Sequence, residues 1–346
     1  MALGVDGVRV GCWTHPEGHT GVTVVLPPPG TVGGAAVRGG APGSREIPAL
    51  SPTGSVQECH AVVLCGGSAF GLAAADGVMA WCEQQGIGLA LPTVTVPIVG
   101  AGVCFDIREA GRPRPGRDAG WAACEAAGPE DPPQGSVGVG AGLTAGKLAG
   151  RQWATKGGQG WALATGRGIT VGALMAVNPV GEVVDVDGEV LAGTRAPADA
   201  PRLPEATIDE IQAWGEAQPD DAGAHLSATG AAGNGTPPDP DVAGHAAGVA
   251  NTVIGCVVTD AKISKFAACR AADLAHTGIA RAVIPAHTSA DGDMLFVLAT
   301  GQGPEVSVDL VAELAARAVA DAIRAAVRHA TGIPGAPADP RARRRG

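Results

Sequence analysis

The stretch GVANTVIG, residues 248–255, stands where a long loop of small residues and prolines gives way to an apolar run. That run, TVIGCVVT from Thr252 to Thr259, is rich in β-branched residues and is typical of a buried strand. The polar pair Asn251–Thr252 at its start has two explanations. In the first, Asn suits the turn before a strand and Thr suits the strand itself. In the second, the chain cuts its own peptide bond between them.

The second explanation has a specific chemistry. A threonine at a new N-terminus carries a hydroxyl and a free α-amine, whose unperturbed pKa of about 7.7–8.0 leaves part of it neutral and able to accept the hydroxyl proton. A nucleophile activated in this way is well established in hydrolases. Before the cut, the same hydroxyl can attack the carbonyl of Asn251 and convert the peptide into an ester, which water then opens. The junction therefore predicts two chains, 1–251 and 252–346.

Regular patterns lie on both sides of the junction and predict sheets covered by helices, an α+β fold. A buried strand ends at Gly66 and Gly67, and a helix follows with Ser68 as its N-cap and Gly86 as its stop. The other predicted strands and helices include a hairpin at 7–13 and 21–26, helices at 118–127, 205–216, 262–276 and 307–330, and strands at 252–259 and 293–301.

Two segments lack such patterns. Residues 217–250 are rich in Gly, Ala, Pro and Asp, and we expect a flexible linker there, because a long unstructured loop is typically functional or disordered. We expect residues 334–346 to form a disordered tail. Residues 1–333 are then one domain, since a chain of this length can bury one large core.

Composition excludes several classes of function. The net charge of −10, with basic residues clustered only near the end of the chain, argues against nucleic-acid binding. No apolar run reaches the length of a membrane span, and no signal peptide is recognisable, so we expect a cytoplasmic protein without a membrane partner. The eight cysteines show no CxxC pair, which favours reduced thiols. We recognise no metal-binding spacing, HxxxH or HxH, among the eight histidines and expect no metal site.

Five segments together resemble the P1-type, or S58-type, peptidases. This is the L-aminopeptidase/D-esterase group of N-terminal-nucleophile hydrolases, which also contains nylon-oligomer hydrolases. The segments are GGSAFGLAAADGV (66–78), GLTAGK (142–147), VNPVG (177–181), ANTVIGCVVTDAKISK (250–265) and HTGIARAVIPAHTSADGDMLFVLATG (276–301). The resemblance implies a four-layer αββα sandwich, self-cleavage, and hydrolysis of a small amide or peptide without metal or organic cofactor. It also implies a homo-oligomer of αβ heterodimers, typically a tetramer.

The resemblance also implies roles for particular residues. Thr252 matches the nucleophile and Asn251 the residue before the cut. Asn178 matches an asparagine whose amide contacts the reacting group, although an Asn before Pro is equally typical of a turn. Lys147 matches a lysine beside the nucleophile, where a buried ammonium lowers the pKa of the amine or steadies developing charge. A lysine that ends a surface strand is the alternative.

Further site residues follow from the same resemblance. Asp291 and Asp293 match an acidic pair opposite the nucleophile, and alternate residues at a strand start can point the same way to orient Lys147 and the new ammonium. A solvated turn is the alternative. Ser68, with the amides of Gly66 and Gly67, is a candidate oxyanion site at a helix N-terminus or simply a cap.

One position departs from the family pattern. Characterised relatives place a tyrosine in the strand after the first long helix, whereas the matching stretch VCFDI offers Phe105, and the chain contains no tyrosine. We therefore expect Phe105 to line a pocket wall, and the substrate preference of those relatives does not transfer.

Three classes of function remain open at this point. The first is an autoprocessed threonine hydrolase, an aminopeptidase or an amidase. The second is an acyltransferase of the ornithine acetyltransferase type, which shares a similar sandwich and a threonine freed by self-cleavage. The third is an uncleaved binding protein that keeps the fold without the chemistry.

Overall fold

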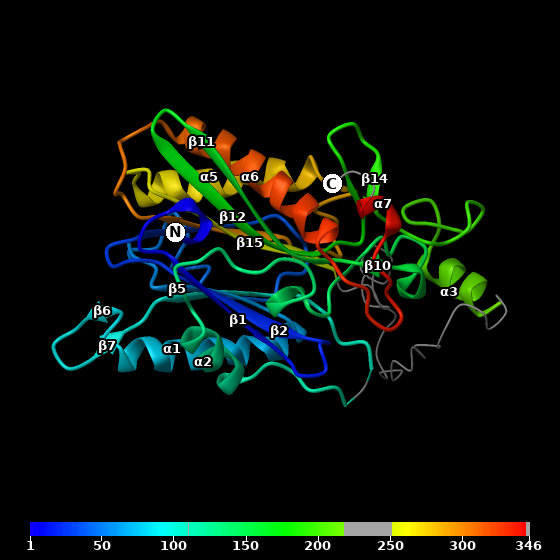
Figure 1. The fold of residues 1–346 in the computed structure, drawn as a ribbon, viewed down its shortest axis with the longest axis horizontal. Helices are drawn as coiled ribbons and strands as arrows, with labels where there is room; N and C mark the ends of the chain where they lie inside the picture. Colours follow the sequence, from blue (N-terminus) through cyan, green and yellow to red (C-terminus); the bar gives the residue numbers. More distant parts are fainter. Residues whose placement is uncertain (110, 218–250, 344–346) are drawn as a thin grey trace.

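Two five-stranded sheets are stacked face to face in the computed structural model, which describes residues 1–109, 111–217 and 251–343. Helices cover both outer faces (Figure 1). The first sheet has the strand order β1-β2-β5-β8-β4 and lies against α1 and α2, while the second has the order β11-β12-β15-β17-β3 and lies against α5 and α6. This is the four-layer αββα sandwich implied by the resemblance.

The elements have the following bounds. The first sheet contains β1 (Arg9–Thr14), β2 (Gly21–Leu26), β5 (Ala61–Cys65), β8 (Val99–Val103) and β4 (Ser44–Arg45), and the second contains β11 (Gly158–Gly166), β12 (Ile169–Asn178), β15 (Thr252–Thr259), β17 (Met294–Ala299) and β3 (Val32–Val37). The α-helices are α1 (Ala74–Gln84), α2 (Arg117–Glu125), α3 (Ile208–Glu216), α5 (Lys265–Ala280), α6 (Val308–Arg328) and α7 (Pro340–Arg343). Short strands are β6 (Leu89–Ala90), β7 (Thr95–Val96), β9 (Thr144–Ala145), β10 (Thr155–Lys156), β13 (Glu182–Val184), β14 (Val190–Ala192) and β16 (Val283–Ile284). Short 3₁₀ helices are η1 (Ala2–Gly4), η2 (Ser68–Ala73), η3 (Gly138–Gly140) and η4 (Arg151–Trp153).

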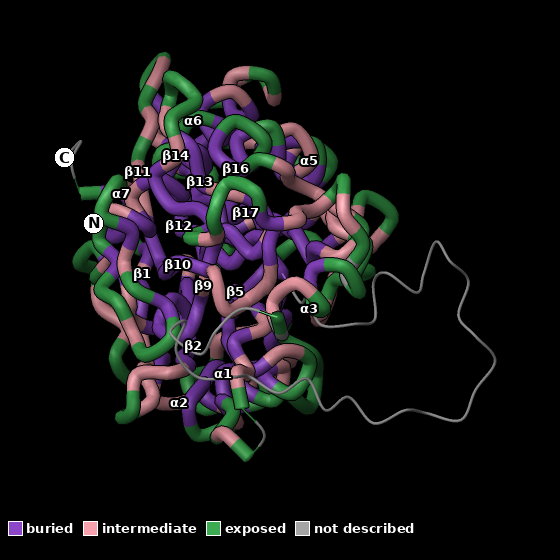
Figure 2. The backbone as a smooth tube through the Cα atoms, turned by 90° about the vertical axis from the view of Figure 1, so that its right-hand side faces the viewer, coloured by how far each residue is buried: buried purple, intermediate pink, exposed green. Residues whose placement is uncertain are grey.

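Strand β15 is buried on both faces, as its apolar run predicts. Successive side chains of a strand point to opposite faces. Accordingly, Val253 and Val257 pack in the cluster under α5 and α6, while Ile254, Cys256 and Val258 pack in the cluster between the two sheets. The central strands of the tube in Figure 2 are therefore coloured as buried. This double burial fixes the position of β15 and of the residues at its start.

The topology of the second sheet brings three chain segments to one place. β12 pairs antiparallel with β15, so that Asn178, the last residue of β12, is the register partner of Thr252, the first residue of β15. β15 pairs parallel with β17, so that both strands begin at the same end of the sheet. An isolated bridge between Asn251 and Asp291 extends this pairing.

Close packing of α6 on β11 depends on a glycine. A Cβ added at Gly160 would overlap the carbonyl oxygen of Ala322 and the backbone nitrogen of Ala326. We expect Gly160→Ala to lower the free energy of unfolding by about 2 kcal/mol or more, because backbone atoms of α6 must move. Gly166→Ala is the matched control, since its Cβ would meet nothing closer than a Leu314 methyl at 3.4 Å. Urea denaturation of both variants measures the difference, and equal stability would contradict this packing.

Two expectations about the ends of elements are wrong. Residues 334–343 are not a disordered tail: Ala336 and Ala342 are buried, and Lys156 donates its backbone N–H to the carbonyl of Pro337 at 2.9 Å. Small side chains and backbone hydrogen bonds anchor this segment, which a search for apolar runs does not detect. Ser68 is not the N-cap of the helix, because η2 precedes α1 and α1 begins at Ala74. The expected linker lies, apart from Ala217, outside the described residues.

No helix in the described ranges is both long enough and apolar enough to cross a membrane.

Candidate active site

The junction itself is buried and uncut in this structure. Thr252 is 5% exposed and Asn251 is 2% exposed. The carbonyl oxygen of Asn251 accepts the backbone N–H of Gly292 at 2.9 Å and also a short hydrogen bond from the hydroxyl of Thr252. The hydroxyl therefore lies against the peptide group that it would attack, and a fixed N–H donor already holds the oxygen on which negative charge would develop.

Lys147 lies at the centre of the polar contacts around this junction. Its ammonium donates to the carbonyl oxygen of Asn178 at 2.8 Å, to Asn178 Oδ1 at 3.1 Å and to Asn251 Oδ1 at 2.9 Å. Burial and next the charge of Arg151 lower the pKa of Lys147 well below its usual range, while Asp291 acts in the opposite direction. The alternative of a surface lysine is excluded, since its side chain is 1% exposed.

Asn178 is held by hydrogen bonds in the same network. Besides contacting Lys147, its Oδ1 accepts the backbone N–H of Thr144 at 3.0 Å, and its Nδ2 donates to the carbonyl of Phe105 at 3.1 Å. A carboxamide has two N–H donors, and the carbonyl of Phe105 accepts one of those of Asn178. Asn178 thus ends β12 and connects three segments around Thr252, beyond the role of a turn residue.

The two predicted carboxylates are both buried at this end of the sheet. Asp293 accepts the backbone N–H of Val253 at 2.7 Å and so fixes the residue next to Thr252. Asp291 accepts the backbone N–H of Thr288 at 2.9 Å and its hydroxyl at 2.6 Å through Oδ2, while its buried Oδ1 has no partner among the described residues. Burial and next the charge of Asp293 raise the pKa of Asp291. Neither carboxylate is hydrogen-bonded to Lys147, whose ammonium donates to oxygens of Asn178 and Asn251 instead. Asp291 acts on Lys147 through its charge.

Sequence reasoning missed a histidine in this cluster. His287 donates its backbone N–H and places Nδ1 at 2.8 Å from the second oxygen of Asp293. Burial acts to lower the pKa of His287, but the hydrogen bond and charge of Asp293 outweigh it and raise this pKa. The signal available in the sequence was the stretch PAHTSADGD, in which a histidine lies six residues before Asp293.

A second histidine, His276, packs against the ring of His287 at 4.9 Å between centroids. Burial lowers the pKa of His276 to about 4, and its Nε2 lies 3.2 Å from the carbonyl of Ala36. Between pH 6.5 and about 4 the unfolded chain therefore binds a proton at this residue that the native chain does not, and stability falls as the pH falls.

The difference in proton binding at His276 between the native and the unfolded chain can be tested by measuring stability at several pH values. His276→Gln keeps an N–H donor for Ala36 but cannot titrate. Relative to the wild type, we expect the variant to gain about 3 kcal/mol of stability between pH 7 and pH 4. The comparison must be with the wild type, because Asp106, whose pKa burial raises to about 6, acts with the opposite sign in this window. Urea denaturation at several pH values measures it, and parallel pH profiles would contradict the assignment.

The predicted oxyanion site at Gly66, Gly67 and Ser68 is not available. Their three backbone N–H groups donate to the carbonyl of Gly21 at 2.9 Å, to Asp106 Oδ1 at 2.7 Å and to the carbonyl of Cys104 at 2.9 Å, respectively. These amides already have acceptors within the protein. At the junction, the backbone N–H that contacts the carbonyl oxygen of Asn251 is that of Gly292 instead. Gly292 lies between the two predicted aspartates, but a contact through its backbone N–H cannot be recognised from the sequence.

Phe105, at the position where the resemblance implies a tyrosine, is half-buried, and a cation lies over its ring. The guanidinium of Arg151 lies over its ring, 4.6 Å from the centroid. Burial and next the charge of Arg108 lower the pKa of Arg151 to about 10, so the group stays charged at neutral pH. On the side of the site beyond Asn178 and Lys147, the ring of Phe105 therefore lies under the positive charge of Arg151.

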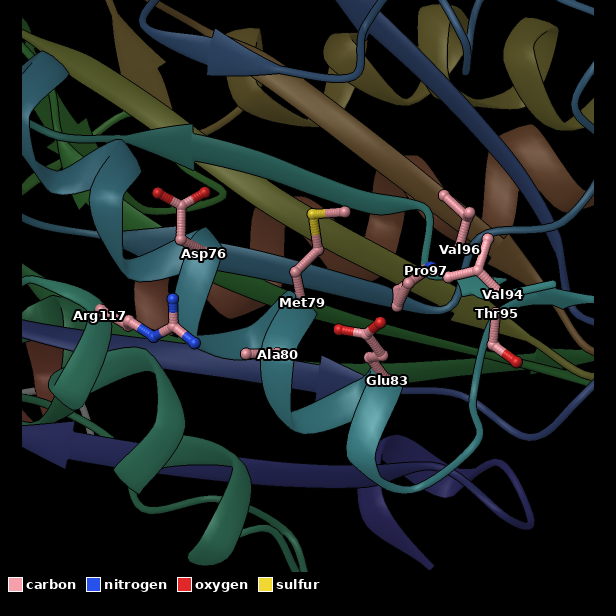
Figure 3. Close-up of a pocket in the computed structure, with 9 residues that line it drawn as sticks. All are labelled: Asp76, Met79, Ala80, Glu83, Val94, Thr95, Val96, Pro97 and Arg117. Carbon is pink, nitrogen blue, oxygen red and sulfur yellow. The ribbon is translucent and has the colours of Figure 1, made fainter.

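Two other features lie apart from this network. A pocket of about 390 Å³ between α1 and the residues after β6 is lined by none of the site residues (Figure 3). Its lining residues are Asp76, Met79, Ala80, Glu83, Val94, Thr95, Val96, Pro97 and Arg117.

The other feature is a cluster in the β1–β2 turn. The ligand atoms of His15, Glu17 and His19 lie within 4.8 Å of one another. The sequence HPEGH at 15–19 is an HxxxH spacing, so the expectation that the histidines lack such a spacing is wrong. The carboxylate of Glu17 is exposed and already pairs with the guanidinium of Arg112 at 3.3 Å, so we assign it no metal function.

The sandwich and the buried strand-start threonine point to the class of hydrolases with the N-terminal-nucleophile fold. The fold is shared with a Burkholderia sp. beta-aminopeptidase, with a TM-score of 0.67 and 20% identity over 99% of this chain and 91% of that one. It is also shared with the L-aminopeptidase D-Ala-esterase/amidase of Ochrobactrum anthropi, described as a new variant of this fold, with a TM-score of 0.65 and 18% identity over 99% and 92% of the two chains.

Comparison of sequences identifies the family of this chain. The model of peptidase family S58 matches residues 3–339, and the chain belongs to this family. It is 42% identical over 96% of its length to an uncharacterized aminopeptidase of Mycobacterium tuberculosis, 95% of which is covered. It is 30% identical over 86% of its length to a 6-aminohexanoate-oligomer endohydrolase of Paenarthrobacter ureafaciens, 74% of which is covered. The protein is therefore a hydrolase.

Proposed function

We propose that this hydrolase cuts itself between Asn251 and Thr252 and then hydrolyses small amide or peptide bonds, as an aminopeptidase or amidase, through an acyl-enzyme on Thr252. The observation that carries the proposal is the Asn251 carbonyl oxygen held between the N–H of Gly292 and the hydroxyl of Thr252. This arrangement combines a nucleophile, an electrophile and an oxyanion donor in a buried site, where such donors act most strongly.

Self-cleavage follows from these contacts. Oγ1 of Thr252 bonds to the carbonyl carbon of Asn251, and the oxygen takes negative charge opposite the N–H of Gly292. The C–N bond then breaks, the nitrogen of Thr252 takes up the proton that its hydroxyl lost, and an ester joins the two residues. Water attacks the ester and leaves a carboxyl group on Asn251 and a free amine and hydroxyl on Thr252.

Turnover reuses the same atoms. The amine of Thr252 takes the hydroxyl proton, the hydroxyl attacks the substrate carbonyl, and the proton passes to the leaving amine. Water then releases the acyl group. Oδ1 of Asp291, which has no partner in the described ranges, is available to accept a hydrogen bond from the new ammonium, and Asp293 holds the following residue through the N–H of Val253. These steps need water and no cofactor.

The assembly and location remain proposals of the same kind. We propose a homo-oligomer of αβ heterodimers, typically a tetramer, in the cytoplasm. Size-exclusion chromatography with light scattering tests the assembly, and a mass of one αβ pair would contradict it.

A substrate assay tests the proposed reaction. We expect the purified protein to release p-nitroaniline from L-leucyl-p-nitroanilide, with free leucine as the second product. Product analysis with and without an added acceptor amine separates hydrolysis from acyl transfer. Leucine as the sole acyl product in both cases supports a hydrolase, while an amide formed with the acceptor would favour the acyltransferase.

A further inference from the structure

The hydrogen bonds of Lys147 bear on which acyl groups fit the site. An ammonium has three N–H donors, and in the uncut chain all three are used. Two go to the backbone and side-chain oxygens of Asn178, which stays in β12 after cleavage. The third goes to Oδ1 of Asn251, which becomes the free end of the α chain. When that end withdraws, one donor of a fully buried ammonium loses its acceptor.

Asn251 is the acyl residue of the first bond that the protein cuts. Since the same hydroxyl of Thr252 attacks this bond and later the substrate, the acyl group of the substrate has to place its carbonyl where the Asn251 carbonyl now lies. Its side chain then extends toward Lys147 as the Asn251 side chain does, and an oxygen of the group bonded to its β-carbon reaches the ammonium at about the observed 2.9 Å.

The surroundings favour a negative charge on this side chain over an amide. Nδ2 of Asn251 is buried without a partner among the described residues, so the amide fits the site incompletely. A carboxylate has no such donor to satisfy. Arg151 adds a second positive charge on the same side, over Phe105, and its guanidinium donates no hydrogen bond within the part of the chain that the structure describes. Asp106 and Asp291 are the carboxylates that oppose these cations.

We propose that the mature enzyme selects acyl groups that carry a carboxylate on the β-carbon, as in α-L-aspartyl and succinyl amides, with Lys147 and Arg151 as the groups that recognise it. This inference rests on the proposed function, because it takes Thr252 as the nucleophile of both reactions.

An isosteric substrate series tests the proposal. Aspartyl, asparaginyl and leucyl side chains have the same branched shape, so their p-nitroanilides differ mainly in polarity and charge. We expect kcat/KM to decrease in the order Asp, Asn, Leu, with aspartyl at least about tenfold above leucyl, the effect of one charge-assisted hydrogen bond in a buried site. A leucyl rate equal to or above the aspartyl rate would overturn the proposal.

Variants assign the preference to its residues. We expect Arg151→Gln to reduce the ratio of aspartyl to asparaginyl kcat/KM by about tenfold, since the Coulomb attraction is lost while a polar group of similar length remains. Arg317→Gln, at an exposed position of α6, should leave that ratio unchanged. Equal ratios in the wild type and Arg151→Gln would remove Arg151 from the proposal.

Inhibition of the wild type provides a readout that needs no variant. Succinamate and butyramide share the amide and the carbon chain, but only succinamate carries the carboxylate. We expect succinamate to inhibit leucyl turnover at a concentration at least about tenfold lower. Equal inhibition, in a protein that is cut at 251/252 and hydrolyses the leucyl substrate, would refute the acyl preference alone. A chain that neither cuts itself nor turns over any of the three substrates would refute both proposals.

Discussion

Thr252→Ala is expected to give a single intact chain of 34.0 kDa with no detectable hydrolysis. The variant lacks the hydroxyl that contacts the carbonyl of Asn251, and it later lacks the proposed nucleophile for any substrate. Loss of a nucleophile typically costs on the order of 10⁴–10⁶ in kcat. The change removes a hydroxyl and a methyl group from a buried position, so the fold should persist.

Denaturing gels and intact mass measure this outcome. Thr252→Ser is the matched control, because it keeps the hydroxyl and the amine and should still be cut and active. Processing of Thr252→Ala at the 251/252 bond would show that another group attacks this bond and would refute the assignment of the nucleophile.

Lys147→Met is expected to slow self-cleavage by about 10²–10³, the usual effect of removing one preorganised electrostatic group. The ammonium holds the side chain of Asn251 and both oxygens of Asn178, so its removal frees the acyl residue beside the nucleophile. Methionine is flexible and fills a similar space without charge. The cut fraction, followed by gel over time after purification, measures the rate.

Lys156→Met is the control for this variant. Lys156 is also fully buried, but its ammonium donates to the carbonyls of Gly140 and Gly157 instead of to atoms of the junction. We expect it to be processed like the wild type. Equal slowing in both variants would indicate a general effect of removing a buried charge, and normal processing of Lys147→Met would exclude a role for this ammonium.

The pattern of apolar residues was sufficient to predict the elements whose structure is determined by burial alone. The strand Thr252–Thr259 has the bounds that its apolar run predicts, and the αββα layering agrees with the resemblance. Helix α5 begins at Lys265 instead of residue 262, because Ser264 accepts the N–H of Ala267 and caps it. Ser68 failed as a cap because a 3₁₀ turn precedes α1, which a single-residue rule does not anticipate.

The parts of the site that could not be predicted depend on tertiary contacts. The N–H of Gly292 meets the carbonyl of Asn251 only because β15 and β17 run parallel, and backbone donors are the same for every residue type. His287 joins Asp293 through a loop conformation that sequence spacing does not specify. Likewise, the stacking of Arg151 on Phe105 brings together residues from distant segments.

N-terminal sequencing of the purified wild-type protein, together with its intact mass, tests the central claim most directly. The account predicts two chains of about 25 and about 9 kDa, in proportion to their share of the 34.0 kDa sequence, with the smaller one beginning Thr-Val-Ile-Gly. A single sequence from the original N-terminus, in a preparation that nevertheless hydrolyses amide substrates, would contradict it.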